Sequence, residues 1–215
     1  MTTSFGFSEK AKVLVIGHDP RLLKSLTLAD HSFFANYFFK PIPTKRNEYA
    51  KYKLAEAVYS YIHFITNYKY KSDELYITNL CNDALPPVKN KTVYISKEKA
   101  EKGLLEIKNV LAESKIELIF AMSQQVNYWM QKLDFYNSNN DFLKKAEPKL
   151  RGVNANPPYY LTRESEAFRL ICAKKYKVDE KHTLIPILHV KNWPLKSSFE
   201  RVYEKSYIQL INELK

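Results

Sequence analysis

Apolar residues in this chain form four short, nearly continuous runs separated by longer segments with a different spacing. The runs are Val13–Ile16, Leu75–Leu80, Glu117–Ala121 and Thr183–His189. Each run is short and is followed by polar or turn-forming residues, a pattern typical of a strand buried on both faces of a sheet. The sequence therefore predicts four strands.

The segments between these runs carry apolar residues at three- and four-residue spacing, which predicts amphipathic helices. Ser96 is a suitable N-cap for one of them, and Ser197 with Glu200 forms a capping box at the last. The polar, proline-bearing region from Asn137 to Tyr160 is expected to be a long excursion. The predicted helices are Arg21–Ala29, Asn47–Tyr68, Lys97–Ser114, Gln124–Leu133, Glu164–Lys174 and Ser197–Leu214.

Strands that alternate with helices of this length predict right-handed crossovers and a parallel sheet covered on both faces. The expected fold class is α/β, with three α/β/α layers around a central four-stranded parallel sheet. The chain has 215 residues, no internal repeat and no linker rich in Gly or Ser. We therefore expect residues 1–215 to form a single domain.

The carboxyl ends of parallel strands share one edge of the sheet, where ligands bind in open α/β folds. Polar residues follow the predicted strands at Asp19, Asn79, Ser123 and His189. Asp19 and His189 are the main candidates for chemistry. Alternatives remain, because an Asp before a Pro also forms turns or caps helices, and Asn79 could cap the turn after its strand.

Two common sites of this architecture are disfavoured. A dinucleotide site needs several glycines in the first strand-to-helix turn, whereas this chain has four Gly in all and one there, Gly17. A hydrolase nucleophile elbow is also missing, because Gly-x-Ser-x-Gly does not occur in the sequence.

The charge balance favours a polyanionic partner, although lysine-rich solvated helices explain it equally well. Lys and Arg number 34 against 23 Asp and Glu, which gives a net charge of +11. The chain also contains 16 Tyr and 12 Phe. Stacking on nucleic-acid bases is one use for such rings, though most are expected in the core.

The two cysteines, Cys81 and Cys172, cannot form a four-thiolate metal site or a secreted type of disulfide framework. No metal or other cofactor is expected, and a reducing cytoplasm is the expected location, with nucleoid association if the source is bacterial. The sequence has no long apolar run, and its first residues lack the apolar segment of a signal peptide. We expect a soluble monomer with no membrane partner.

The motifs at the strand ends resemble those of the uracil-DNA glycosylase superfamily. Its first motif, an apolar strand running into Gly-x-Asp-Pro, is matched by Gly17-His18-Asp19-Pro20, and its last by the segment His189–Leu195. The segment Tyr76–Leu80, followed by Pro86-Pro87, resembles the region that carries the base-reading Asn. The resemblance implies the glycosylase-like α/β/α fold.

The resemblance also implies roles in releasing a base flipped out of DNA. Asp19 would position water and offset positive charge on the sugar, and His189 would stabilise the leaving uracil anion. Asn79 would hydrogen-bond the uracil edge, and Phe33 or Phe34 would stack on the base, with core packing as the alternative for both rings. The implied substrate-binding residues are Gly17, His18, Phe33, Phe34 and Asn79.

Contact with DNA is implied for the residues around the two outer motifs. Leu195, or alternatively Trp193, would fill the space that the base leaves in the duplex. Arg21 stands where the superfamily usually has an aromatic residue that excludes the thymine methyl group, so base selectivity is open and a phosphate contact is the other use for Arg21. The implied DNA-binding residues are Arg21, Lys191, Trp193 and Leu195.

The leading hypothesis is a monofunctional DNA glycosylase that hydrolyses the N-glycosidic bond of uracil or a related damaged base in base excision repair. A second hypothesis is a non-catalytic module that keeps the glycosylase fold and binds nucleic acid or protein. A third is an α/β enzyme that acts on a free nucleoside or another small molecule.

Overall fold

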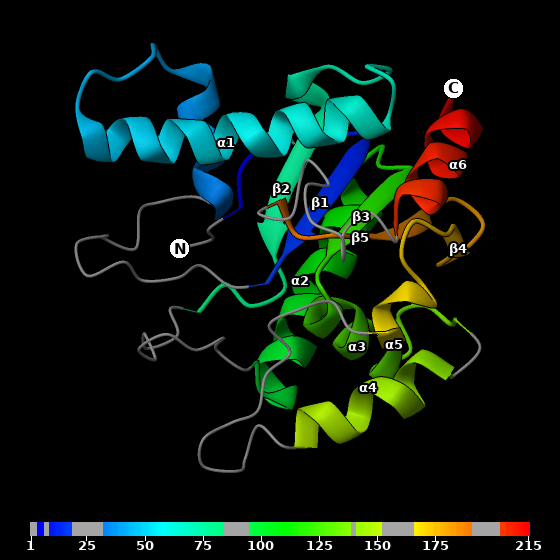
Figure 1. The fold of residues 1–215 in the computed structure, drawn as a ribbon. Helices are drawn as coiled ribbons and strands as arrows, with labels where there is room; N and C mark the ends of the chain where they lie inside the picture. Colours follow the sequence, from blue (N-terminus) through cyan, green and yellow to red (C-terminus); the bar gives the residue numbers. More distant parts are fainter. Residues whose placement is uncertain are drawn as a thin grey trace.

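The computed structural model describes residues 4–6, 9–18, 32–83, 95–138, 141–151, 166–190 and 203–215 (Figure 1). Its strands form one five-stranded mixed sheet in the order β2-β1-β3-β5-β4, with helices packed around it. The predicted α/β class is confirmed. The strands are β1 (Val13–Gly17), β2 (Leu75–Asn79), β3 (Leu118–Met122), β4 (Tyr176–Lys177) and β5 (Thr183–Ile187).

The prediction of a purely parallel, four-stranded sheet is wrong at one edge. Strands β1, β2, β3 and β5 are parallel, as expected, but β4 pairs antiparallel with β5 through Tyr176 opposite Leu184. The turn between β4 and β5 is closed by Asp179, whose carboxylate accepts hydrogen bonds from the backbone N–H groups of Lys181 and His182. A strand of two residues held by such a turn leaves no apolar run in the sequence.

The described helices occupy the connections between strands, except α6, which follows the last strand, and they lie largely where the spacing predicts them. Ser96 caps α2 by accepting a hydrogen bond from the Lys99 N–H at 3.4 Å, as expected. The helices are α1 (Arg46–Ile65), α2 (Lys97–Glu113), α3 (Gln124–Lys132), α4 (Asp141–Arg151), α5 (Glu166–Arg169) and α6 (Glu204–Leu214), with 3-10 segments η1 (Ser32–Phe39) and η2 (Ser72–Glu74).

The strand order explains how the helices divide between the two faces of the sheet. The crossover from β1 to β2 runs in one direction along the sheet, and the crossovers from β2 to β3 and from β3 to β5 run in the other. Right-handed crossovers then place α1 on one face and α2 with α3 on the opposite face. In Figure 1, α1 and α6 lie in the upper part of the view, and α2 to α5 lie together below.

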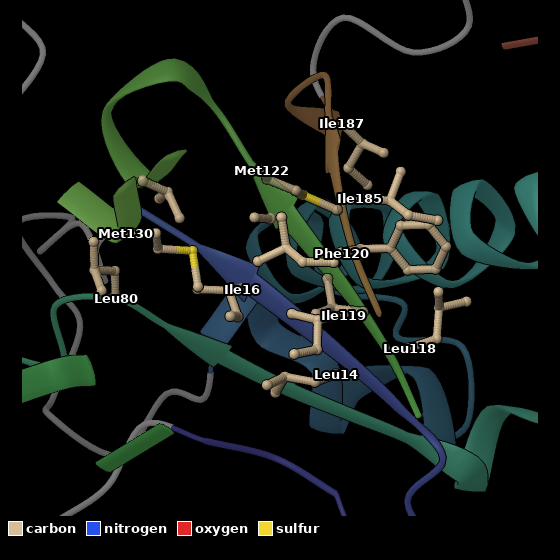
Figure 2. Packing of buried hydrophobic residues seen from close by; sticks show 14 of the residues in the cluster. Leu14, Ile16, Leu80, Leu118, Ile119, Phe120, Met122, Met130, Ile185 and Ile187 are labelled. Carbon is tan, nitrogen blue, oxygen red and sulfur yellow. The ribbon is translucent and has the colours of Figure 1, made fainter. Parts of the chain in front are cut away.

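The core is built on β1, β3 and β5. Every residue of β1 and β3 is buried, so helices cover both faces of these strands. Figure 2 shows the apolar side chains of the three strands side by side, with Met130 of α3 and Leu80 beyond β2 packed around them. This packing fixes the strand ends where the candidate residues lie.

Two other predictions need correction or lie outside the described residues. The long excursion expected over 137–160 contains a helix that the spacing does not predict: α4 occupies residues 141–151, and its Phe142 and Ala146 are fully buried in the core. The helices expected from Arg21 and from Ser197 begin outside the described residues; within them, α6 begins at Glu204. Among the described helices, none is both long and apolar enough to cross a membrane.

Candidate functional site

The carboxyl ends of β1, β2, β3 and β5 lie along one edge of the sheet, which we call the rim. Gly17, the last residue of β1, is the register partner of Asn79, the last residue of β2. The ladder continues past both strands, because Leu80 N–H donates to the Gly17 carbonyl at 2.9 Å. β5 ends at the rim with Ile187, two residues before His189. Parallel strands therefore bring Gly17, Asn79 and His189 to the same edge.

Gly17 leaves room for two site side chains to approach the backbone of β1. A Cβ atom at this position would lie 2.6 Å from Cζ of Phe33 and would also collide with Oδ1 of Asn79. The Phe33 ring and the Asn79 amide thus both occupy space that a side chain at position 17 would need. The glycine is required here for close approach, which is one of the roles that only glycine can fill.

Phe33 also reaches the other end of the rim. Its ring centroid is 5.8 Å from that of His189, with the two planes tilted by 47°. Phe33 is half-buried and comes from η1, on the connection between β1 and α1. One aromatic ring therefore lies against the ends of β1 and β2 and also beside the candidate imidazole.

The structure separates the two phenylalanines that the sequence left as alternatives. Phe34 packs edge-on against Tyr37 at 6.3 Å, and Nζ of Lys51 lies 5.3 Å from its centroid. Phe33 lies at the rim, and Phe34 turns toward α1. Both residues have left-handed backbone conformations, with φ of 52° and 55°. Such conformations cost of order 1 kcal/mol or more for each non-glycine residue and occur preferentially at functional sites.

Asn79 is nearly inaccessible, with 2% of its surface exposed. Its neighbour Thr78 makes a side-chain hydrogen bond to Ser4 at 2.8 Å. The Asn79 Oδ1 atom lies against the backbone of Gly17, where a Cβ atom would collide with it. A side-chain amide at this position has both donor and acceptor groups.

His18 follows Gly17 and is buried, with 9% of its surface exposed. Its carbonyl accepts a hydrogen bond from Cys81 N–H at 3.1 Å, so its backbone extends the pairing of β1 with the chain beyond β2. Five other predicted site residues lie outside the described residues: Asp19, Arg21, Lys191, Trp193 and Leu195. Their roles remain predictions from the sequence.

Ser123 is a further residue at the rim, and the sequence predicts no role for it. It follows β3 with φ of 82° and ψ of 156°, a region that non-glycine residues rarely adopt. The Asn127 amide holds this turn by donating hydrogen bonds to the carbonyls of Ala121 at 2.9 Å and Ser123 at 2.8 Å. No sequence signal marks such strain, since it depends on the buried amide four residues ahead.

The described side chains of the rim provide amide and imidazole groups for hydrogen bonds and one aromatic ring. Among the described residues, no group of three or more His, Cys, Asp or Glu side chains is placed to hold a metal ion. Cys81 and Cys172 are both buried, and neither forms a disulfide. The described part of the rim therefore brings together an aromatic ring, Phe33, and two side chains able to form hydrogen bonds, Asn79 and His189.

No protein-family model matches this sequence, and no significant match was found among curated proteins.

Proposed function

We propose that this protein is a DNA glycosylase of the uracil-DNA glycosylase superfamily, which hydrolyses the N-glycosidic bond of uracil or a related damaged base flipped out of DNA. The observation that carries the proposal is the placement of Phe33 between the Gly17–Asn79 pair and His189. A planar base needs an aromatic face, an edge-reading amide and a group that stabilises its anion, and these three meet at one rim.

In this proposal, Phe33 stacks on the extruded base. Asn79 accepts a hydrogen bond from uracil N3–H and donates one to O4. His189 donates a hydrogen bond to O2, where negative charge develops as the base leaves. The burial of Asn79 makes its hydrogen bonds selective, since a base with the wrong donor and acceptor pattern would leave the amide unpaired.

Asp19 completes the reaction in the same proposal. Its carboxylate positions a water molecule and offsets the positive charge that the sugar acquires. The C1′–N1 bond breaks and its electron pair leaves with the uracil, the water oxygen bonds to C1′, and one water proton is taken up by the uracil anion. The reaction consumes one water and needs no cofactor. Asp19 follows Gly17 and His18 directly in the sequence, so the proposal assigns its carboxylate to the rim.

The charges on the described surface support a DNA partner. Lys40, Lys45 and Arg46 are all exposed, and they follow η1, the segment that carries Phe33. Lys40 Nζ lies 4.7 Å from the centroid of the Tyr37 ring, so basic and aromatic groups share this surface. Phosphate contacts of this kind position a nucleic acid without reading its sequence.

The proposal assigns the remaining DNA contacts to residues outside the described part of the chain. Arg21 would contact phosphate, Lys191 and Trp193 would lie on the DNA backbone or bases, and Leu195 would enter the space left by the flipped base. We further propose that the protein acts as a monomer in the cytoplasm; its two buried cysteines, which form no disulfide, suit a reducing compartment.

The test is base release from oligonucleotides that contain one uracil, or one of several damaged or mismatched bases, in single- and double-stranded form. Alkali-labile sites report release, and salt-dependent binding is measured in parallel. We expect Asp19→Asn and His189→Ala to retain binding while lowering the release rate by roughly 100-fold or more. Equal release by the wild type and both variants would remove these residues from the mechanism. Binding without release of any base would favour the non-catalytic module.

A further inference from the structure

The backbone immediately before His189 is held by two buried tyrosines from different helices. Tyr207 of α6 accepts a hydrogen bond from the Leu188 N–H at 2.8 Å, and Tyr61 of α1 donates one to the Leu188 carbonyl at 3.2 Å. The two hydroxyl oxygens are 2.6 Å apart. Leu188, Tyr61 and Tyr207 thus form a closed ring of three hydrogen bonds.

The direction of every bond in this ring is fixed by chemistry. The Leu188 N–H can only donate and its carbonyl can only accept, so the Tyr61 proton points to that carbonyl. Tyr207 must then donate its own proton to Tyr61, while accepting from Leu188. Each hydroxyl donates once and accepts once, and bonds arranged in sequence polarise and strengthen one another.

The ring lies where the sheet no longer holds the chain. β5 ends at Ile187, whose carbonyl accepts a hydrogen bond from Ser123 N–H at 3.2 Å. Leu188 is the single residue between the end of that strand and His189. Its N–H and carbonyl pair with the tyrosine hydroxyls in place of a neighbouring strand.

The surroundings keep the ring intact. Leu188 and Tyr61 are fully buried and Tyr207 is 2% exposed. Burial raises the pKa of Tyr207 well above its ordinary value of 10, so the hydroxyl stays protonated over the physiological range. The Cys172 thiol adds a weak contact to Tyr207 at 3.9 Å.

We propose that Tyr61 and Tyr207 are positioning residues that fix the place and orientation of His189 at the rim. The inference rests on the proposed function, because it assigns these tyrosines to the same site. They do not touch the base. They hold the backbone of Leu188, the residue directly before His189. In the proposal, this sets the direction of the His189 side chain toward Phe33 and the leaving base.

The test compares Tyr207→Phe and Tyr61→Phe with a matched control. Tyr70→Phe also removes a hydroxyl from a largely buried tyrosine, but its partner is Glu117 Oε1 at 2.6 Å. Glu117 directly precedes β3, so this bond lies at the opposite edge of the sheet from the rim. The control therefore removes one partly buried hydrogen bond without touching Leu188.

Two readouts are used: the NMR signals of the His189 imidazole in the free protein, and the single-turnover release rate with the binding constant for a uracil-containing oligonucleotide. We expect Tyr207→Phe to move the His189 signals and to lower the release rate by about 10- to 100-fold at unchanged affinity, because small displacements of a reacting group are costly. Tyr61→Phe should have a smaller effect in the same direction. Tyr70→Phe should leave both readouts as in the wild type.

Unchanged His189 signals in both ring variants, or a rate loss equal to that of Tyr70→Phe, would overturn the inference. Should Tyr207→Phe fail to fold, Tyr61→Phe decides, since it spares the bond to the Leu188 N–H. A wild-type protein that releases no base would contradict the proposed function alone, and the His189 signals would still decide the positioning role.

Discussion

Substitution of Gly17 by Ala tests the packing at the rim with a single added methyl group. The new Cβ would lie 2.6 Å from Phe33 Cζ and would also collide with Asn79 Oδ1. Because non-bonded carbons rest about 3.5–4.0 Å apart, the Phe33 ring must retreat by about 1 Å. Both side chains assigned to the base would be displaced at once.

Two consequences of this displacement are measurable. Overpacking of this kind costs about 1–3 kcal/mol, which for a chain of this size lowers Tm by roughly 2–10 °C. Displacing the ring and the amide by about 1 Å is expected to lower uracil release by roughly 100-fold. Thermal unfolding gives the first quantity, and single-turnover release from a uracil-containing oligonucleotide gives the second.

Val15→Ala is the matched control for Gly17→Ala. Val15 lies in the same strand, is fully buried and pairs with Ile77 and Phe120, away from the rim. Its truncation is expected to lower the free energy of unfolding by a similar amount, about 1–3 kcal/mol, because of the cavity that it leaves. The release rate of uracil should not change. The reasoning fails if Gly17→Ala releases uracil at the wild-type rate, or if Val15→Ala loses as much activity.

Three further predictions concern single side chains. Phe33→Ala should weaken binding of a uracil-containing strand by about 1–3 kcal/mol, the usual contribution of base stacking, whereas Phe34→Ala should not. Equal losses of affinity for the two variants in a binding assay would refute the distinction between the two rings. Tyr59→Phe should leave stability in urea unchanged or raised, because the buried Tyr59 hydroxyl has no hydrogen-bond partner among the described residues; a clear loss of stability would contradict this. Hydrogen bonds from Lys12, at 2.6 Å, and from Lys71 N–H lower the pKa of Glu74 below its ordinary value of 4.5. Wild type should therefore be more stable than Glu74→Gln above about pH 4.5, and the gap should close as the pH falls through the lower folded-state pKa, which unfolding curves at several pH values can check.

Much of the sheet follows from local sequence patterns. The apolar runs before Gly17, Asn79 and Ser123 predict β1, β2 and β3 because strands buried on both faces need continuous apolar residues. The ends of those strands then predict which polar residues reach the rim. These inferences hold because each depends on a few neighbouring residues.

The features that were not predicted depend on tertiary contacts. β4 exists because Asp179 closes a turn onto β5, and α4 exists because Phe142 finds space in the core. The choice of Phe33 over Phe34 depends on two left-handed residues in η1. The contact of Tyr61 with Tyr207 joins residues 146 positions apart, and no local pattern reports such a pair.

The proposed function is tested most closely by the free uracil that the purified protein liberates from an oligonucleotide with one deoxyuridine, quantified by mass spectrometry. The wild-type protein should liberate one free uracil for each abasic site that it forms, and His189→Ala should release uracil roughly 100-fold or more slowly, with binding to the same oligonucleotide retained. Release by His189→Ala at the wild-type rate, or binding by the wild type without release of uracil or any damaged base, would contradict it.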